Sequence, residues 1–471
     1  MVTSPLDKIV GAYDVRGLVD SELTPSVAHA LGVAWVTTQH LTGQSVIIGH
    51  DMRPSSPELA DALADGAASA GAHVIELGLA STDMVYYASG SHNASAVMIT
   101  ASHNPASYNG LKFTKPGAKG LSRANGLAEI AQMAKEALSG SQPQTVSTDA
   151  VPGTRERVDI LGDYATYMRS LVDLSHSRPL RVVVDAANGM AGLTVPEVFG
   201  STQWPVEIIP MYFELDGTFP NHEANPLNPD NLVDLQAAVT AHGADAGLAF
   251  DGDADRVFVI DENGDPVTPS AIGQMVAGRE IARYRPAHPD QTPTIIYNLI
   301  CSRALPEKIT ALGATPHRTA VGHSLIKTEM EKTGAIFGAE HSAHYYFRDF
   351  WGADNGMLAA LHVLAELGAT PATLSELCAD YSPYAASGEL NFRVENVASV
   401  MERILDQFGP RGKVDRLDGI TVSSNDSEPM WWLNVRSSNT EPLVRLNVEA
   451  ASVESMEAVR DEVSAVISGQ N

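Results

Sequence analysis

The side chains best suited to chemistry lie in four short polar segments, and the first is Ser102-His103-Asn104-Pro105. This segment follows Thr100-Ala101 at the end of an apolar run, so it places one nucleophilic hydroxyl in a sharp loop after an expected strand. A serine in such a loop can accept and donate a phosphoryl group. Taken alone it is more often a structural turn residue, and its interpretation depends on the other three segments.

The second segment, Asp251-Gly-Asp-Ala-Asp-Arg256, carries three carboxylates at alternate positions directly after an apolar strand. Clustered carboxylates repel one another unless a cation neutralises them, and hard oxygen ligands suit Mg2+. One alternative is an EF-hand, because Asp251, Asp253 and Asp255 match its first ligand positions and Glu262 its last. Arg256 stands where that loop needs glycine, so we interpret the segment as a divalent-metal loop. A solvated acidic turn is the other alternative.

Two further segments offer groups for a ligand. In Glu340-His-Ser-Ala-His344, the carboxylate and the Ser342 hydroxyl can contact vicinal sugar hydroxyls, and the imidazole of His344 can move a proton. Arg436-Ser-Ser-Asn-Thr-Glu-Pro442, followed by Arg445, combines guanidinium groups, hydroxyls and turn N–H groups, as a clamp for a dianionic phosphate requires. Each segment is by itself compatible with an ordinary polar loop, so the hypothesis depends on all four together.

Alternating helix-like and strand-like patterns predict the elements that position these loops. Expected strands at 96–100, 246–250 and 335–338 end just before the first three segments, each within a repeating α/β pattern. From about residue 371, strands with flanking helices predict a smaller α+β unit. We therefore predict an α/β protein with three related mixed-sheet domains and a smaller C-terminal α+β domain. The predicted domains are residues 1–153 with the serine loop, 154–264 with the acidic loop, 265–372 with the Glu340 loop and 373–471 with the Arg436 loop.

Composition excludes several classes of partner. The chain of 471 residues has 31 basic and 57 acidic side chains, for a formal charge of −26, which disfavours nucleic acids and anionic membranes. We find no apolar run long enough to span a bilayer and no secretory pattern, so we expect a cytoplasmic protein. Cys301 and Cys378 are far apart and predict neither a disulfide framework nor a thiolate metal site. The Gly-x-Gly fingerprint of dinucleotide binding and the Walker A loop are both absent.

Together the four segments resemble the active-site loops of the α-D-phosphohexomutase superfamily, in the order of that family. The resemblance spans nearly the whole chain, and residues 340–350 with Asp354-Asn-Gly356 are most similar to its phosphomannomutase or dual phosphomannomutase/phosphoglucomutase branch. Further matching motifs are Tyr13-Asp-Val-Arg-Gly17, Gly49-His-Asp-Met-Arg53, Asn109-Gly-Leu-Lys112, Phe219-Pro-Asn-His222 and Val321-Gly-His-Ser324. The resemblance implies four domains around a central cleft and an isomerase that moves phosphate between O6 and O1 of a hexose. It also implies one Mg2+ ion, and hexose 1,6-bisphosphate as intermediate and activator.

The resemblance assigns a role to each matching residue. Ser102 would carry the transferred phosphoryl group, and Asp251, Asp253 and Asp255 would hold Mg2+ together with an oxygen of that phosphoserine. The implied catalytic residues are Ser102, His103, Lys112, Arg256, His344 and Arg16, with Lys112 and His344 as candidates for general base and acid. The implied substrate-binding residues are Glu340, Ser342, His323, Arg436, Ser438, Asn439, Thr440 and Arg445.

Departures from the family pattern bear on the choice of sugar. Ile300 stands where many relatives place a lysine, so one cationic contact is absent or comes from Arg318 or His323. We expect hexose phosphates as the small-molecule partners: mannose 1- and 6-phosphate, with the glucose phosphates in addition. Phosphoglucosamine mutase and glucose-specific phosphoglucomutase are the nearest alternatives, and a metal-dependent sugar phosphatase or a noncatalytic sugar-phosphate-binding protein are the others. The sequence leaves the oligomeric state open.

Overall fold

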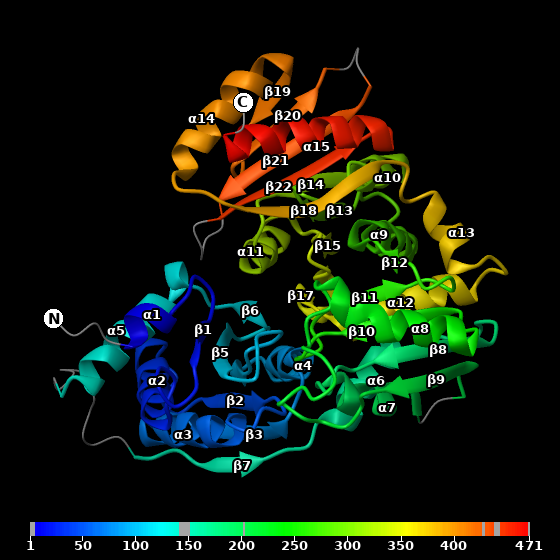
Figure 1. Cartoon of the computed structure of the whole chain (residues 1–471). Coiled ribbons are helices and arrows are strands. Elements are labelled where there is room, and N and C mark those ends of the chain that lie inside the picture. The colour runs from blue at the N-terminus through cyan, green and yellow to red at the C-terminus, as the bar shows by residue number, and fades with distance from the viewer. Residues whose placement is uncertain (1–4, 141–150, 201–202, 426–428, 438–442, 470–471) are drawn as a thin grey trace.

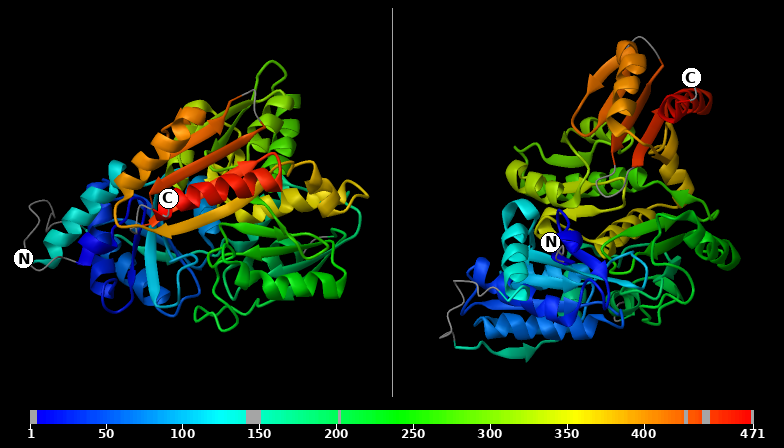
Figure 2. Two further views of the ribbon diagram at one scale, coloured as in Figure 1. Left: turned by 45° about the horizontal axis from the view of Figure 1, so that its top comes forward. Right: turned by 60° about the vertical axis from the view of Figure 1, so that its left-hand side comes forward.

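The protein is built from four β-sheets with their helices, which follow one another along the chain. The structure, a computed structural model, describes residues 5–140, 151–200, 203–425, 429–437 and 443–469. We call the units built on the four sheets domains I to IV. In Figure 1, domain I (blue to cyan) and domain II (green) lie beside each other, and domain IV (orange to red) stands at the opposite end beyond domain III. The right-hand view in Figure 2 shows domain IV at one end of the molecule, and the predicted fold class is confirmed.

Domain I contains a mixed sheet with strand order β1-β5-β4-β2-β3-β7 and with β6 beside β5. Strand β4 alternates its buried side chains between two cores, because helices cover both faces of the sheet. Its strands are β1 (Val15–Leu18), β2 (Ser45–His50), β3 (His73–Leu79), β4 (Ser95–Ile99), β5 (Tyr108–Lys115), β6 (Lys119–Gly120) and β7 (Arg155–Arg157). Its helices are α1 (Pro5–Ile9), α2 (Pro25–Thr38), α3 (Ser56–Ser69), α4 (Thr82–His92) and α5 (Leu127–Leu138).

Domains II and III contain mixed sheets of five strands each, in the orders β12-β11-β10-β8-β9 and β14-β13-β15-β16-β17. Domain II consists of β8 (Leu180–Asp185), β9 (Val206–Met211), β10 (Ala246–Phe250), β11 (Val257–Ile260), β12 (Pro266–Val267), α6 (Leu161–Leu171), α7 (Ala191–Gly200) and α8 (Val233–His242). Domain III consists of β13 (Thr294–Asn298), β14 (Thr315–Thr319), β15 (Phe337–Ala339), β16 (Tyr345–Phe347), β17 (Ala353–Asp354), α9 (Pro269–Tyr284), α10 (Ala304–Ala311), α11 (His323–Thr333), α12 (Gly356–Gly368) and α13 (Leu374–Ala379).

Domain IV contains an antiparallel sheet with strand order β18-β22-β21-β20-β19. Two helices, α14 (Val397–Phe408) and α15 (Val453–Ser468), bury their apolar sides in a core formed by residues of this domain alone. The buried core of domains I, II and III is by contrast continuous. The strands are β18 (Ala385–Arg393), β19 (Gly412–Asp415), β20 (Ile420–Ser424), β21 (Trp431–Ser437) and β22 (Leu443–Ala450).

The three mixed sheets share one feature that positions the candidate loops. In each sheet, an inner strand pairs in parallel with one neighbour, and the chain then turns back as an antiparallel strand on its other side. The serine loop joins β4 to β5, the acidic loop joins β10 to β11, and the Glu340 loop joins β15 to β16. All three loops therefore leave the carboxyl end of a parallel strand, where α/β sheets bind their ligands.

Two predicted domain boundaries fall inside a sheet. Strand β7 lies beyond residue 153, yet it pairs with β3 at the edge of the first sheet. Strand β12 lies beyond residue 264, yet it pairs with β11 in the second sheet. Both are short edge strands, whose sequences carry too few residues to show a strand period. Among the described residues, no helix is long and apolar enough to cross a membrane.

Candidate active site

Ser102 is held in a strained backbone conformation. Its φ is 51°, a left-handed value that costs a non-glycine residue about 1–3 kcal/mol and often marks a functional loop. Its amide donates to the Thr100 Oγ1 at 2.9 Å, and its Oγ donates to the Asp251 Oδ2 at 3.0 Å. The serine is only 4% exposed, so its hydroxyl is buried next to a carboxylate.

Arg53 holds the backbone of the serine loop, a role that sequence reasoning missed. Its guanidinium donates to the carbonyl oxygens of Ser102, Asn104, Pro105 and Tyr108 at 2.7–2.9 Å. The guanidinium is fully buried and is balanced by Asp51, whose Oδ2 lies 3.2 Å from Nε. The motif Gly49-His-Asp-Met-Arg53 at the end of β2 was a signal for this role, since β2 is the neighbour of β4.

Asp251, Asp253 and Asp255 converge as the sequence predicted for a metal loop. Each carboxylate offers an oxygen, and these atoms all lie within 4.8 Å of one another in a buried setting. The Oδ1 atoms of Asp253 and Asp255 are buried and accept no hydrogen bond from the described residues. Three clustered carboxylates, two of which have a buried oxygen that accepts no hydrogen bond, match the hard oxygen donors that Mg2+ prefers, so the residues present fit this ion. The positive φ of Ala254, 61°, forms the tight turn that aims them.

Two cations stand beside these carboxylates, the partly buried Lys112 and the buried Arg256. The Lys112 Nζ lies 2.7 Å from an oxygen of Asp253 and 2.7 Å from an oxygen of Asp255. Burial lowers the pKa of Lys112, but the two carboxylates outweigh it and hold the pKa well above its ordinary value. Arg256 donates from Nε and from a terminal nitrogen to the Asp251 Oδ2, at 3.0 and 2.8 Å. Lys112 therefore bridges two carboxylates of the metal loop, and its role as a general base stays a prediction.

His103 is held beside Ser102 in the neutral form. Its Nδ1 lies 3.2 Å from the Ser102 Oγ and 2.5 Å from a terminal nitrogen of Arg256, which donates to it. Burial and the positive charge of Arg256 hold the pKa of His103 well below its ordinary value. The Arg16 guanidinium reaches the same loop and donates to the Asn104 side chain at 2.7 Å. Both predicted residues thus border the Ser102 hydroxyl or its loop.

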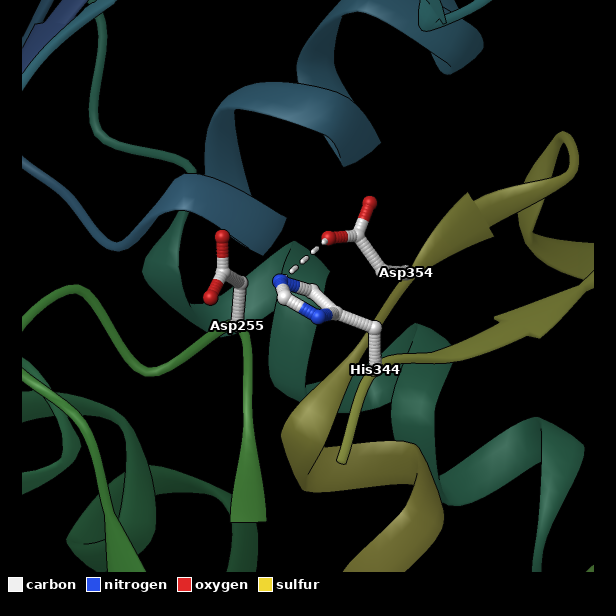
Figure 3. Close-up of side chains that lie close together, drawn as sticks. All are labelled: Asp255, His344 and Asp354. Carbon is white, nitrogen blue, oxygen red and sulfur yellow. Dashed lines mark ion pairs between the residues drawn. The ribbon is translucent and has the colours of Figure 1, made fainter. Parts of the chain in front are cut away.

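The Glu340 loop brings its functional groups to the metal loop. The His344 Nδ1 lies 3.0 Å from the Ser342 Oγ, and its Nε2 lies 4.0 Å from the Asp354 Oδ2. Figure 3 shows the imidazole of His344 reaching toward Asp354, with Asp255 on its other side. These three residues also form a cluster within 4.8 Å, but the Lys327 ammonium already neutralises Asp354 at 2.8 Å.

Glu340 is buried and is fixed by three donors. Its oxygens accept hydrogen bonds from the Asn298 side chain, the Gly322 amide and the Tyr346 hydroxyl at 3.2, 3.2 and 2.7 Å. Burial raises the pKa of Glu340, and these donors oppose that rise. The carboxylate is therefore oriented in advance, as a contact to sugar hydroxyls requires.

The predicted phosphate clamp contains two arginines that share one carboxylate. Arg436 pairs with Glu389 of β18, and an Arg445 terminal nitrogen lies 3.2 Å from the other oxygen of Glu389. Sequence reasoning missed Glu389, because it lies 47 residues before Arg436 in the chain and shares no local pattern with it. The predicted residues Ser438, Asn439 and Thr440 lie outside the described residues, as does the side chain of His323 at the start of α11.

The position of Ile300 is apolar and buried, at 7% exposure, so it offers no cation to a ligand. Arg318, one of the two predicted substitutes, is paired with Asp415 of domain IV. The Val321 amide also donates to Asp418 of domain IV, at 3.2 Å. These contacts hold the segment between β14 and α11 against domain IV. Arg318 is therefore part of an ion pair between domains III and IV.

Comparison with known proteins agrees with this geometry. Four family models match in order: phosphoglucomutase/phosphomannomutase α/β/α domains I, II and III at residues 7–139, 162–264 and 274–384, and the C-terminal domain at residues 389–466. A phosphomannomutase of Vibrio cholerae is 35% identical over 443 residues, 90% of this chain and 93% of that one. The phosphohexose mutases of Xanthomonas campestris are 34% identical over 90% of this chain and 94% of theirs.

A solved structure supports the same class. A phosphoglucomutase/phosphomannomutase family protein from Burkholderia thailandensis superposes with a TM-score of 0.86 at 29% identity, covering 100% of this chain and 98% of that one. The fold and these matches define a phosphohexomutase, an isomerase that transfers a phosphoryl group. The chain belongs to the phosphoglucomutase/phosphomannomutase family.

Proposed function

We propose that the protein interconverts mannose 1-phosphate and mannose 6-phosphate, and the two glucose phosphates in addition, by way of a phosphorylated Ser102. The observation that carries this proposal is the buried contact between the Ser102 Oγ and Asp251, inside a cluster of three carboxylates and two cations. A noncatalytic binding protein has no need of a strained serine at a candidate metal site. The sugar assignment rests on the phosphomannomutase relatives.

Ser102 must first receive a phosphoryl group from a hexose 1,6-bisphosphate. Phosphoserine then gives this group to the free hydroxyl of a bound hexose monophosphate: the bond between Oγ and phosphorus breaks and one to the sugar oxygen forms. The bisphosphate then reorients within the site, so that its other phosphate faces Ser102. This second phosphoryl group returns to the serine. Mg2+ held by Asp251, Asp253, Asp255 and an oxygen on Ser102 would draw negative charge from the phosphoryl oxygens.

The side chains around Ser102 are suited to stabilising negative charge and to moving the proton during this transfer. Arg256, Lys112 and Arg16 supply positive charge where the phosphoryl group develops negative charge. His344 is our candidate for accepting the proton of the attacking sugar hydroxyl and returning one to the departing oxygen, because its imidazole is 18% exposed beside Asp255 and Asp354. Lys112 stays the second candidate for proton transfer, as the sequence predicts.

The substrate's second phosphate needs a separate site, since it must stay bound while the first one reacts. Arg436 and Arg445 supply that site in this proposal, and Glu340 and Ser342 contact the sugar hydroxyls. Because this site binds the phosphate and does not contact one particular face of the sugar, it accepts both orientations of the bisphosphate. Glu389 holds the two guanidinium groups together until a phosphate dianion arrives.

A coupled mutase assay tests the proposal. Mannose 1-phosphate, glucose 1-phosphate and glucosamine 1-phosphate are compared, each with Mg2+ and a catalytic amount of hexose 1,6-bisphosphate. We expect rates for mannose and glucose within about tenfold, a transition-state preference below about 1.4 kcal/mol. Predominant turnover of glucosamine 1-phosphate rejects the sugar assignment. Release of inorganic phosphate in proportion to substrate loss rejects mutase activity in favour of a phosphatase.

A further inference from the structure

Helix α4 of domain I begins against the metal loop of domain II. Its first residue, Thr82, is fully buried, as are its neighbours Ser81 and Asp83. The first amide groups of a helix have no acceptor within the helix and need one outside it. The Thr82 amide donates to the Asp253 carbonyl at 3.0 Å, although 171 residues separate the two in the chain. The start of the helix is therefore docked on the loop that carries the three aspartates.

The Thr82 side chain makes a second contact with the same aspartate. Its Oγ1 donates to the Asp253 Oδ2 at 2.5 Å, and the Lys112 Nζ lies 2.7 Å from that same oxygen. The other oxygen, Oδ1, is buried and accepts no hydrogen bond from the described residues. Two donors on Oδ2 fix the rotation of the carboxylate and leave Oδ1 as the atom that can ligate a cation.

A second hydroxyl of domain I also contacts the metal loop. The Ser102 Oγ donates to the Asp251 Oδ2 at 3.0 Å, but in the proposed cycle this oxygen carries the phosphoryl group and then has no proton to donate. The Thr82 hydroxyl takes no part in the transfer. Its contact with Asp253 therefore persists through the whole cycle, while the contact from Ser102 is lost whenever the serine is phosphorylated.

The position of Thr82 is itself fixed from both domains. The Ser81 hydroxyl caps the first turn of α4. Ser81 and Tyr164 both donate from their hydroxyls to the carboxylate of Asp83, and Tyr164 comes from α6 of domain II. Each domain therefore holds a buried aspartate of the other, because domain I holds Asp253 and domain II holds Asp83.

We propose that Thr82 is a positioning residue that orients the Asp253 carboxylate and so sets the affinity of the metal loop for a divalent cation. The proposal rests on the metal loop of the proposed function and not on the choice of sugar. Thr82 acts through Asp253 and does not act on the substrate. Outer partners that orient a metal ligand contribute a factor of about 10–100 to metal affinity. The effect of this one hydroxyl should therefore be measurable in the binding of the metal alone.

Titration of the full chain with Mn2+ alone, followed by the electron paramagnetic resonance signal of the free ion, tests this proposal. Mn2+ takes the same hard oxygen ligands as Mg2+. Thr82→Val removes the hydroxyl at nearly constant volume and keeps the amide that donates to the Asp253 carbonyl. We expect it to weaken Mn2+ binding about tenfold or more. Thr82→Ser keeps the hydroxyl and should bind Mn2+ within about threefold of the wild type.

The matched control is Ser89→Ala, because it also removes a buried hydroxyl from α4. The Ser89 hydroxyl bonds to Ala94, Lys115 and Ala118, which all lie outside the metal loop. We expect this variant to bind Mn2+ as tightly as the wild type. An equal loss of affinity in Ser89→Ala and Thr82→Val assigns the effect to the helix as a whole and overturns the proposal.

Other results also overturn the positioning role. An affinity of Thr82→Val within about twofold of the wild type does so, and so does a loss in Thr82→Ser as large as that in Thr82→Val. Where Thr82→Val does not fold, Thr82→Ala carries the same expectation. Absence of saturable Mn2+ binding to the wild type up to about 10 mM overturns the metal loop and this proposal with it. The expected contrast in a protein that does not turn over hexose phosphates supports the positioning role and rejects the proposed function, so the two claims fail separately.

Discussion

Replacing Arg53 by methionine should open the serine loop, and the structure sets the size of the effect. The guanidinium donates to four carbonyl oxygens of the loop and balances the buried Asp51. Removing one partner of a buried ion pair costs about 3–5 kcal/mol, because the other charge stays behind without compensation. Hydrogen bonds from a charged donor contribute about 1.5–3 kcal/mol each, but they do not add to the ion-pair cost in full. We therefore expect Arg53→Met to destabilise the loop by about 3–5 kcal/mol.

Hydrogen exchange measured by mass spectrometry reports this local opening, which is preferable to global unfolding for a chain of four domains. The amides of Asn104 and Tyr108 are hydrogen-bonded within the loop, to Ala101 and Pro105. Their protection should fall by roughly two to three orders of magnitude in Arg53→Met. The double variant Asp51→Asn/Arg53→Met should recover part of the loss, since it removes the stranded charge. Exchange within about threefold of the wild type in Arg53→Met would refute this account of the loop.

The effect should also depend on pH. Burial raises the pKa of Asp51, and Arg53 opposes that rise. Without Arg53 the folded-state pKa rises further above the unfolded value, so the folded state binds the extra proton and loses stability as pH rises through this interval. The deficit of Arg53→Met should therefore be smaller at pH 5 than at pH 8. A deficit that grows on acidification would contradict this sign.

The remaining predictions concern the site and one buried acid. Asp253→Asn should raise the Mg2+ concentration for half-maximal activity about tenfold or more, because the orphaned Oδ1 loses its charge, and an unchanged metal requirement would remove Asp253 from the metal site. Lys112→Met should lower kcat by about 10²–10³ through lost charge stabilisation, and a loss below about threefold would contradict that role. Burial raises the pKa of Asp83 to about 7, so the wild type should lose stability from about pH 4 to pH 7 more steeply than Asp83→Asn. Parallel melting temperatures of Asp83→Asn and the wild type over that range would refute the shift.

The convergence of the acidic loop, and the position of three of the loops at strand ends, could be predicted because each of these loops keeps its functional residues within a few positions of one another. The alternate spacing of Asp251, Asp253 and Asp255 predicts a bound cation. The apolar strand before them places them at the end of a sheet. Arg436 with Arg445 likewise predicts an anion site from a local pattern. Local patterns of this kind predict the geometry of a loop, because one turn or one hairpin determines how its side chains are placed.

Contacts between distant segments could not be read from the sequence. Arg53 reaches four carbonyls some fifty residues away, and Glu389 joins two arginines from other strands, so neither role leaves a local pattern. Strands β7 and β12 are paired because of the sheets they extend, which their own two or three residues do not encode. The positive φ of Ser102 has the same origin, because the surrounding structure imposes it on a residue that does not prefer it.

The central claim is that Ser102 carries the phosphoryl group between the two sugar positions. The direct measurement is incubation with hexose 1,6-bisphosphate labelled with ³²P, followed by quenching and mapping of the labelled peptide. The account predicts stoichiometric label on Ser102, which chases into hexose monophosphate and disappears together with turnover in Ser102→Ala. Label on another residue, or full mutase turnover in Ser102→Ala, would contradict it.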